Sequence, residues 1–148
     1  MAALLASRDA QMPMPSSVFV MSPWADLTLS GSTIIEKQEV DPTLTREGLR
    51  WGVTAYLAPA NPSDPYASPA LADLRGLPPM LIQVGSHEIL LSDAIRLAGK
   101  AAKDEVAITL DVVPGVPHVF QAFAAMFDEG AAALSRATEF LREHFPVD

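Results

Sequence analysis

An acidic residue and a histidine each follow a strand-like run in this sequence. Glu88 comes after the apolar run 80–84, and His118 comes after the run 107–113. A carboxylate can fix the tautomer of an imidazole and stabilise its charged form, which makes the imidazole an effective general base. Functional groups gather at the carboxyl ends of parallel strands. The order acid, then histidine, is that of the last two members of a Ser-acid-His relay.

The nucleophile of such a relay is not visible in the sequence. The 148 residues contain no Gly-x-Ser-x-Gly turn, and no His-Gly-Gly run that would form an oxyanion hole. Ser22, Ser86 and Ser92 do not lie on a turn of that kind, so we do not expect any of them to replace the nucleophile. The sequence therefore predicts a general base with its carboxylate, but without a nucleophile.

Asp93 is a second candidate for the acid. It falls inside the next helical stretch, so we expect it to point away from His118 or to bond the backbone of a loop. The alternative interpretation of Glu88 is a solvated residue at a helix start, where negative charge is favourable. The neighbouring His87 does not complete a zinc motif with Glu88, because no second histidine follows at helical spacing.

Two aromatic residues, Phe120 and Phe123, come directly after His118. They are candidates for the wall of a pocket that binds the acyl or the alcohol part of a substrate. Packing in the hydrophobic core is the equally simple alternative, because large aromatic side chains dominate protein cores. The sequence leaves both interpretations open.

The elements that would position these residues alternate along the chain. Continuous apolar runs rich in β-branched residues predict buried strands at about 18–22, 80–85 and 107–113. Helical spacing predicts helices at 1–9, 41–57, 89–104, about 120–127 and 130–145. Strands that alternate with helices indicate an α/β fold with a parallel sheet covered on both faces.

Finer features of these elements are also predicted. Asp41 or Thr43 is expected to cap the helix that ends near residue 57. In the final helix, Leu134, Ala137, Phe140 and Leu141 are expected to share the apolar face. The polar segment 28–40 is expected to be exposed, and the proline-rich segment 59–69 is expected to be a loop.

Composition excludes several classes of function. The net charge of −8 and the lack of a basic run argue against a nucleic-acid partner. The chain has no cysteine, so disulfides are excluded and a structural zinc site is not expected. The first nine residues lack the basic start of a signal peptide, and nothing approaches the roughly 18 apolar residues of a membrane span. We therefore expect a cytoplasmic protein.

Taken together, several segments resemble the bacterial hormone-sensitive-lipase family of carboxylesterases, within the α/β-hydrolase superfamily. The resemblance extends over nearly the whole chain but over only the C-terminal half of such an enzyme. The segments that carry it are Ser22-Pro23-Trp24-Ala25-Asp26-Leu27, Asp64-Pro65-Tyr66-Ala67-Ser68-Pro69, Leu77-Pro78-Pro79 with the run 80–85, Glu88-Ile89-Leu90-Leu91, and Pro117-His118-Val119-Phe120-Gln121.

The resemblance implies that Glu88 holds the acid position and His118 the base position of a Ser-Glu-His esterase. Residues 1–5 would belong to the helix after the nucleophile, and the nucleophilic serine, the oxyanion loop and the cap helices would lie upstream of Met1. The chain would then be one partial α/β-hydrolase domain, residues 1–148. The implied substrate is a small acyl ester, and no metal or organic cofactor is implied.

These expectations have consequences for the chain by itself. It should be inactive or nearly so, because the nucleophile and the oxyanion donors are absent. The strand at 18–21 would expose an apolar edge, to be covered by the missing N-terminal half, by a second chain or in a homo-oligomer. Family dimers imply 106–113 and 130–145 as contact surfaces. Two alternatives stay open, namely a non-catalytic α/β binding module and one subunit of a split esterase.

Overall fold

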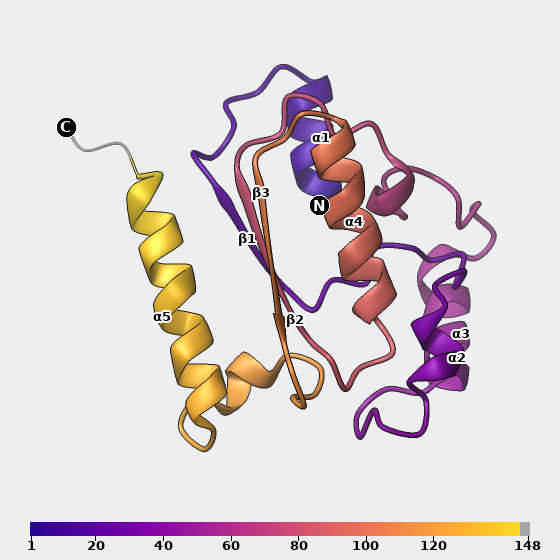
Figure 1. Cartoon of the computed structure of the whole chain (residues 1–148). Coiled ribbons are helices and arrows are strands. Elements are labelled where there is room, and N and C mark those ends of the chain that lie inside the picture. Colours follow the sequence, from indigo (N-terminus) through magenta and orange to yellow (C-terminus); the bar gives the residue numbers. More distant parts are fainter. Residues whose placement is uncertain (146–148) are drawn as a thin grey trace.

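A parallel three-stranded sheet forms the centre of the computed structural model, which describes residues 1–145 (Figure 1). The strands are β1 (Val18–Met21), β2 (Met80–Gly85) and β3 (Ile108–Val113), and they lie in the order β1-β2-β3. Met80 pairs with Val18 on one side and with Ile108 on the other. The predicted α/β fold with a parallel sheet is confirmed, and the three predicted strands differ from the observed ones by at most one residue at an end.

Helices cover both faces of the sheet (Figure 1). Helices α1 (Ala2–Asp9) and α4 (Leu91–Lys103) lie on one face, and α5 (Asp128–Glu143) lies on the other. Helices α2 (Thr33–Glu36) and α3 (Arg46–Leu57) lie beyond α4, near the carboxyl ends of the strands. Two short 3₁₀ helices, η1 (Pro69–Leu71) and η2 (Phe120–Phe123), complete the described elements. In the described residues, no helix is both long and apolar enough to cross a membrane.

Strand β2 forms the middle of the core and is buried along its whole length. Its continuous apolar sequence fits a strand that is covered on both faces. The polar exception is Gln83, whose Nε2 donates to the backbone oxygen of Ala133 at 2.8 Å and to Asp111 Oδ2 at 3.1 Å. Gln121 in η2 donates to Gln83 Oε1 at 3.1 Å. These bonds satisfy the buried amide and connect the sheet to α5 and to the segment after His118.

The segment 28–40 is exposed at most of its positions, as its polar composition predicts, but part of it is buried. It contains α2, in which Thr33 and Ile34 are buried. Ile34 packs against Leu49, Ile89 and Leu90 in a small hydrophobic cluster. A four-residue helix with one apolar side chain in a pocket gives no periodic signal, which explains why the composition does not indicate the buried part.

Two local predictions about helices are wrong. Thr45 caps α3 by accepting the Gly48 N–H at 3.1 Å, whereas Asp41 accepts the Thr43 N–H within the preceding turn. Candidate cap residues that stand close together cannot be distinguished by type alone. In α5 the buried face consists of Gly130, Ala133 and Ala137, so only Ala137 of the predicted apolar face is fully buried.

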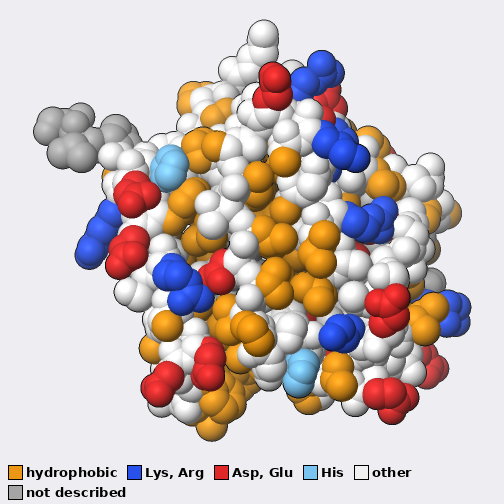
Figure 2. All heavy atoms as spheres, in the orientation of Figure 1, with side chains coloured by type: hydrophobic (Ala, Val, Ile, Leu, Met, Phe, Trp, Pro, Cys, Tyr) orange, Lys and Arg blue, Asp and Glu red, His pale blue; other side chains and the backbone are white. Residues whose placement is uncertain are grey.

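The two edges of the sheet differ in their surroundings. Within residues 1–145, β1 is paired only with β2, which leaves its other edge without a strand. On the side of β3, Figure 2 shows hydrophobic side chains gathered along the middle of the molecule, between α4 and α5. Val112 in β3 and Leu134 in α5 are among the exposed apolar residues. Both edges thus present apolar surface beside backbone that can pair.

Candidate active site

The structure brings Glu88 and His118 together at the carboxyl ends of β2 and β3. Glu88 lies between β2 and α4 and is fully buried, with 0% of its surface exposed. His118 lies in the loop after β3, and 23% of its side chain is exposed. The distance from His118 Nδ1 to Glu88 Oε2 is 2.9 Å. Because a carboxylate accepts at Nδ1, the neutral ring keeps its proton there, and Nε2 remains the nitrogen that can exchange a proton with a substrate.

The second oxygen of Glu88 is also occupied. Oε1 accepts the hydroxyl of Ser22 at 2.7 Å and the backbone N–H of Gly85 at 2.8 Å. A buried carboxylate is stable only when donors replace the lost water, and here three donors do so. The carboxylate is therefore held in one orientation, with Oε2 turned to the imidazole.

Gly85 allows the loop of His118 to approach the end of β2. A Cβ at this position would lie 2.2 Å from the backbone oxygen of Val116 and 2.8 Å from that of Pro117. The same loop is fixed by the His87 N–H, which donates to Val116 O at 3.1 Å. A side chain at position 85 would push the loop, and with it the imidazole, away from the acid.

Asp93 does not contact His118 and instead bonds the backbone of the loop after β1. Its Oδ2 accepts the backbone N–H groups of Ala25 and Asp26, both at 2.9 Å, so it bonds loop backbone rather than His118. Its Oδ1 is buried without a hydrogen-bond partner among the described residues. Burial raises the pKa of the Asp93 carboxyl to about 6, although the two backbone donors act in the opposite direction.

The side chain of Asp26, whose backbone N–H bonds Asp93, is a carboxylate with several hydrogen-bond donors around it. Burial works against its charge, but donors from Ser30 and Thr28, together with Arg96, lower its pKa to about 2. Arg96 Nη1 lies 2.6 Å from Asp26 Oδ2. The loop after β1 is therefore fixed by two buried carboxylates, one paired with an arginine and one whose pKa is raised by burial.

Comparison with known proteins identifies the architecture. The profile of a family described as an alpha/beta hydrolase fold matches residues 1–122, which is most of the chain. The chain belongs to the alpha/beta-hydrolase family.

Named relatives place the chain in the branch that contains the bacterial hormone-sensitive lipases. An acetyl-hydrolase of Streptomyces hygroscopicus is 41% identical over 141 residues, which cover 95% of this chain and 47% of that protein. An esterase of Acinetobacter venetianus is 41% identical over 143 residues, with the same coverage. The crystal structure of an esterase from the bacterial hormone-sensitive lipase family superimposes with a TM-score of 0.95 at 40% identity, covering 98% of this chain and 49% of that one. The chain thus spans about half the length of these relatives, and corresponds to their C-terminal half.

A cleft of about 470 Å³ lies beside His118 in this hydrolase half. Its lining includes Trp24, Leu44 and Trp51, and His118 borders it. The side of the cleft formed by α3 is open to solvent, since 75% of the Trp51 surface is exposed. The cleft therefore places an apolar surface next to the imidazole.

The two phenylalanines after His118 lie outside the lining of that cleft. Phe120 is fully buried and packs with Val113, Val116 and Ala133. Phe123 is 38% exposed, and its ring centroid lies 5.9 Å from that of Phe127. In the described chain, the apolar wall next to the histidine therefore comes from residues 24, 44 and 51 instead.

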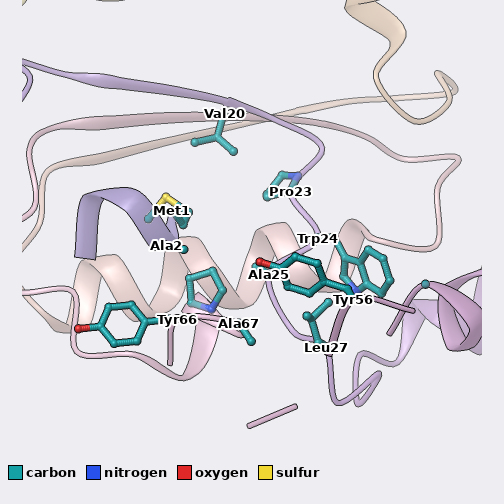
Figure 3. Close-up of a pocket in the computed structure, with 12 residues that line it drawn as sticks. Met1, Ala2, Val20, Pro23, Trp24, Ala25, Leu27, Tyr56, Tyr66 and Ala67 are labelled. Carbon is teal, nitrogen blue, oxygen red and sulfur yellow. The ribbon is translucent and has the colours of Figure 1, made fainter. Parts of the chain in front are cut away.

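A second cleft of about 470 Å³ lies along β1 (Figure 3). Figure 3 shows Val20 of β1 on one side and Tyr56 of α3 close to Trp24 on the other, with Met1 and Ala2 of the first helix near the strand. The lining is mostly apolar, and it includes Tyr66 and Pro69. Among residues 1–145, no group of three or more His, Cys, Asp or Glu residues is placed to hold a metal ion.

Sequence reasoning did not assign roles to Ser22 and Gly85. Both stand directly at strand ends, which is the position that drew attention to Glu88 and His118. A glycine that closes an otherwise apolar strand signals close approach of another backbone. A serine after a strand has no comparable signal, because its partners come from distant parts of the chain.

Proposed function

We propose that this chain is the half of a Ser-Glu-His carboxylesterase that carries the acid and the base. His118 is the general base, and Glu88 orients it and stabilises its charged form. The observation that supports this most is the 2.9 Å contact between His118 Nδ1 and a fully buried carboxylate at the ends of neighbouring parallel strands. The names of the relatives, esterase and acetyl-hydrolase, support the same reaction class.

The mechanism assigns one proton uptake and one proton release to His118 in each half of the catalytic cycle. Nε2 takes the proton of the nucleophilic serine as the serine oxygen attacks the ester carbonyl, and gives it to the departing alcohol to leave an acyl-enzyme. In the second half of the cycle, Nε2 takes a proton from the water that attacks the acyl-enzyme, and gives it to the serine oxygen as the bond between that oxygen and the acyl carbon breaks and the acid product forms. Glu88 keeps the imidazolium in place during both steps. The serine and the oxyanion donors belong to the other half of the enzyme.

The partner of this chain is therefore the N-terminal half of the enzyme, which would cover the exposed side of β1. The edge of β1 has unpaired backbone groups that a further strand could bond, and the cleft in Figure 3 could hold apolar side chains of the N-terminal half. The cleft next to His118 would hold a short acyl ester, with Trp24 and Trp51 against its apolar part.

By itself the chain is inactive, and it is stable only with the N-terminal half or as an oligomer that covers the exposed edge of β1. The apolar surface over β3 and α5 is the candidate face for pairing two such enzymes.

A joined enzyme tests the assignment. The N-terminal half of the Streptomyces hygroscopicus acetyl-hydrolase, fused before this chain, should hydrolyse p-nitrophenyl butyrate, and His118→Ala should abolish turnover. His144→Ala is the matched control, because its ring contacts Phe140 at the end of α5, through the Phe140 backbone oxygen and the Phe140 ring, and not Glu88.

Two results would contradict the proposal. Turnover by the separate 148-residue chain that is lost in His118→Ala would mean that a complete site exists without the other half. A fused protein that is folded but inactive would favour a non-catalytic binding module instead.

A further inference from the structure

One hydroxyl connects the acid to the backbone beside the base. Ser22 directly follows β1 and is only 3% exposed. Its Oγ donates to Glu88 Oε1 at 2.7 Å and accepts the backbone N–H of Val119 at 3.0 Å. Val119 is the residue after His118, so a single side chain links the ends of all three strands.

The backbone at both ends of this link is strained. Ser22 has φ of +44° and Val119 has φ of +50°, in the left-handed region that favours glycine. Neither residue is glycine, and a β-branched side chain such as valine is rarely found there. Such conformations persist only when the surrounding contacts determine them, and they concentrate at functional sites. The Ser22 hydroxyl provides one of those contacts at each end.

We propose that Ser22 is a positioning residue for the Glu88–His118 pair. This inference rests on the proposed function, because it concerns the same acid and base. By giving its proton to Oε1, the hydroxyl directs Oε2 to the imidazole. By accepting the Val119 N–H, it holds the loop that carries the imidazole. Ser22 thereby fixes both members of the pair relative to each other.

The same geometry separates Ser22 from a nucleophilic role. Its proton already points to a carboxylate, and its oxygen already accepts a backbone donor. A nucleophilic serine instead gives its proton to the imidazole. In the described chain, the imidazole is bonded to Glu88 through Nδ1 and not to Ser22.

The test replaces the hydroxyl in the full 148-residue chain. Ser22→Ala removes both bonds and keeps the Cβ, whereas Ser22→Gly also relieves the positive φ. Ser68→Ala is the matched control, because Ser68 is fully buried, accepts the Leu27 N–H at 2.7 Å and donates to Pro62 O at 2.6 Å. The two serines make the same kinds of bond, but only Ser22 bonds Glu88.

The first readout is the ring tautomer of neutral His118, measured from its ¹⁵N shifts, together with hydrogen exchange of the Val119 amide. We expect the Nε2–H tautomer to rise about fivefold and the amide to exchange about tenfold faster in both Ser22 variants, since a hydrogen bond to a charged group is lost. Ser68→Ala should change neither. In a Glu88→Gln background, Ser22→Ala should shift the tautomer no further.

The second readout is turnover of the fused enzyme. Ser22→Ala should lower kcat for p-nitrophenyl butyrate about tenfold with KM unchanged, because orientation of the base affects the chemical step and not binding. Equal effects of Ser22→Ala and Ser68→Ala on tautomer and kcat would overturn the proposal, as would an unchanged tautomer in both Ser22 variants. If the wild-type fused enzyme does not turn over, the proposed function fails, while the tautomer still decides the role of Ser22.

Discussion

Two buried carboxylates, Glu88 and Asp93, lie close in sequence but differ in their hydrogen-bond partners. Both are fully buried. Glu88 uses both oxygens, for an imidazole, a hydroxyl and a backbone N–H. Asp93 uses one oxygen for two backbone N–H groups and leaves the other without a partner in the described chain.

If Glu88 is the acid, as proposed, the difference means that a shifted pKa does not by itself mark a catalytic acid. Asp93, whose pKa is raised by burial, contacts only the loop after β1. Glu88 is the acid that contacts a titratable partner bordering a cleft. Perturbed pKa values concentrate at functional sites, but buried structural groups share them. The identity of the partner is the better guide in this molecule.

The largest expected contrast is in activity. In the fused enzyme, Glu88→Gln should lower kcat about 10³- to 10⁴-fold, because a neutral amide neither selects the tautomer nor stabilises the imidazolium. Asp93→Asn should cost less than about tenfold, since it keeps an oxygen for the Ala25 and Asp26 N–H groups. Steady-state hydrolysis of p-nitrophenyl butyrate measures both. A larger loss in Asp93→Asn would make Asp93 the acid.

The next contrast is in the pH dependence of stability. Because the folded state raises the pKa of Asp93 from 3.8 to about 6, the unfolded chain loses this proton first as pH rises. The free energy of unfolding should therefore fall by about 2 kcal/mol between pH 4 and pH 6 relative to Asp93→Asn, which cannot titrate. Urea unfolding of the fused protein at several pH values measures the difference. Parallel pH curves for the two proteins would show that Asp93 titrates normally.

The control for this prediction is Asp26→Asn. The pKa of Asp26 is lowered to about 2, so its charge adds stability above the unfolded pKa of 3.8 and loses it as pH falls towards 2. Its removal should change the curve below pH 4 and reduce the slope between pH 4 and pH 6 only in part, because burial is the largest cause of the raised pKa of Asp93 and the charge of Asp26 is a smaller one.

The smallest expected difference is in the stability cost of replacing two glycines. Gly85 lies against the loop that carries His118, and Gly31 lies against Ser92 and Asp93. Gly85→Ala would place a Cβ 2.2 Å from the Val116 backbone oxygen and should cost about 2 kcal/mol. At Gly31, a Cβ would meet two side-chain ends, Ser92 Oγ at 2.3 Å and Asp93 Oδ1 at 2.9 Å, rather than backbone, so Gly31→Ala should cost less than Gly85→Ala. Urea unfolding ranks the two. A larger cost at Gly31 would mean that the Asp93 region is the more rigid of the two.

The strands and the main helices could be predicted because their signals are local. The apolar run of β2 and the helical stripe of α4 each identify an element without reference to the rest of the chain. Helix α2 was missed because its burial depends on a pocket formed by Leu49 and Ile89, which lie elsewhere in the sequence. Local periodicity cannot report such a contact.

The candidate site was predictable in part, as the fold was: its acid and its histidine were predicted, but their further contacts were not. Position at a strand end suggested Glu88 and His118, and the expectation that Asp93 would bond loop backbone matches its two hydrogen bonds. The link through Ser22 could not be predicted, because its partners lie 66 and 97 residues away. The lining of the cleft was also missed, since Leu44 and Trp51 reach it from a helix and turn far from His118 in the sequence.

The order of strands has a consequence for synthesis of the chain on the ribosome. Each strand pairs with the one made before it, β1 with β2 and then β2 with β3. The sheet can therefore grow by one strand at a time as the chain emerges, without waiting for a later segment to be inserted. Ser22 is made first, Glu88 second and His118 last. The imidazole thus arrives at a carboxylate that two donors already hold.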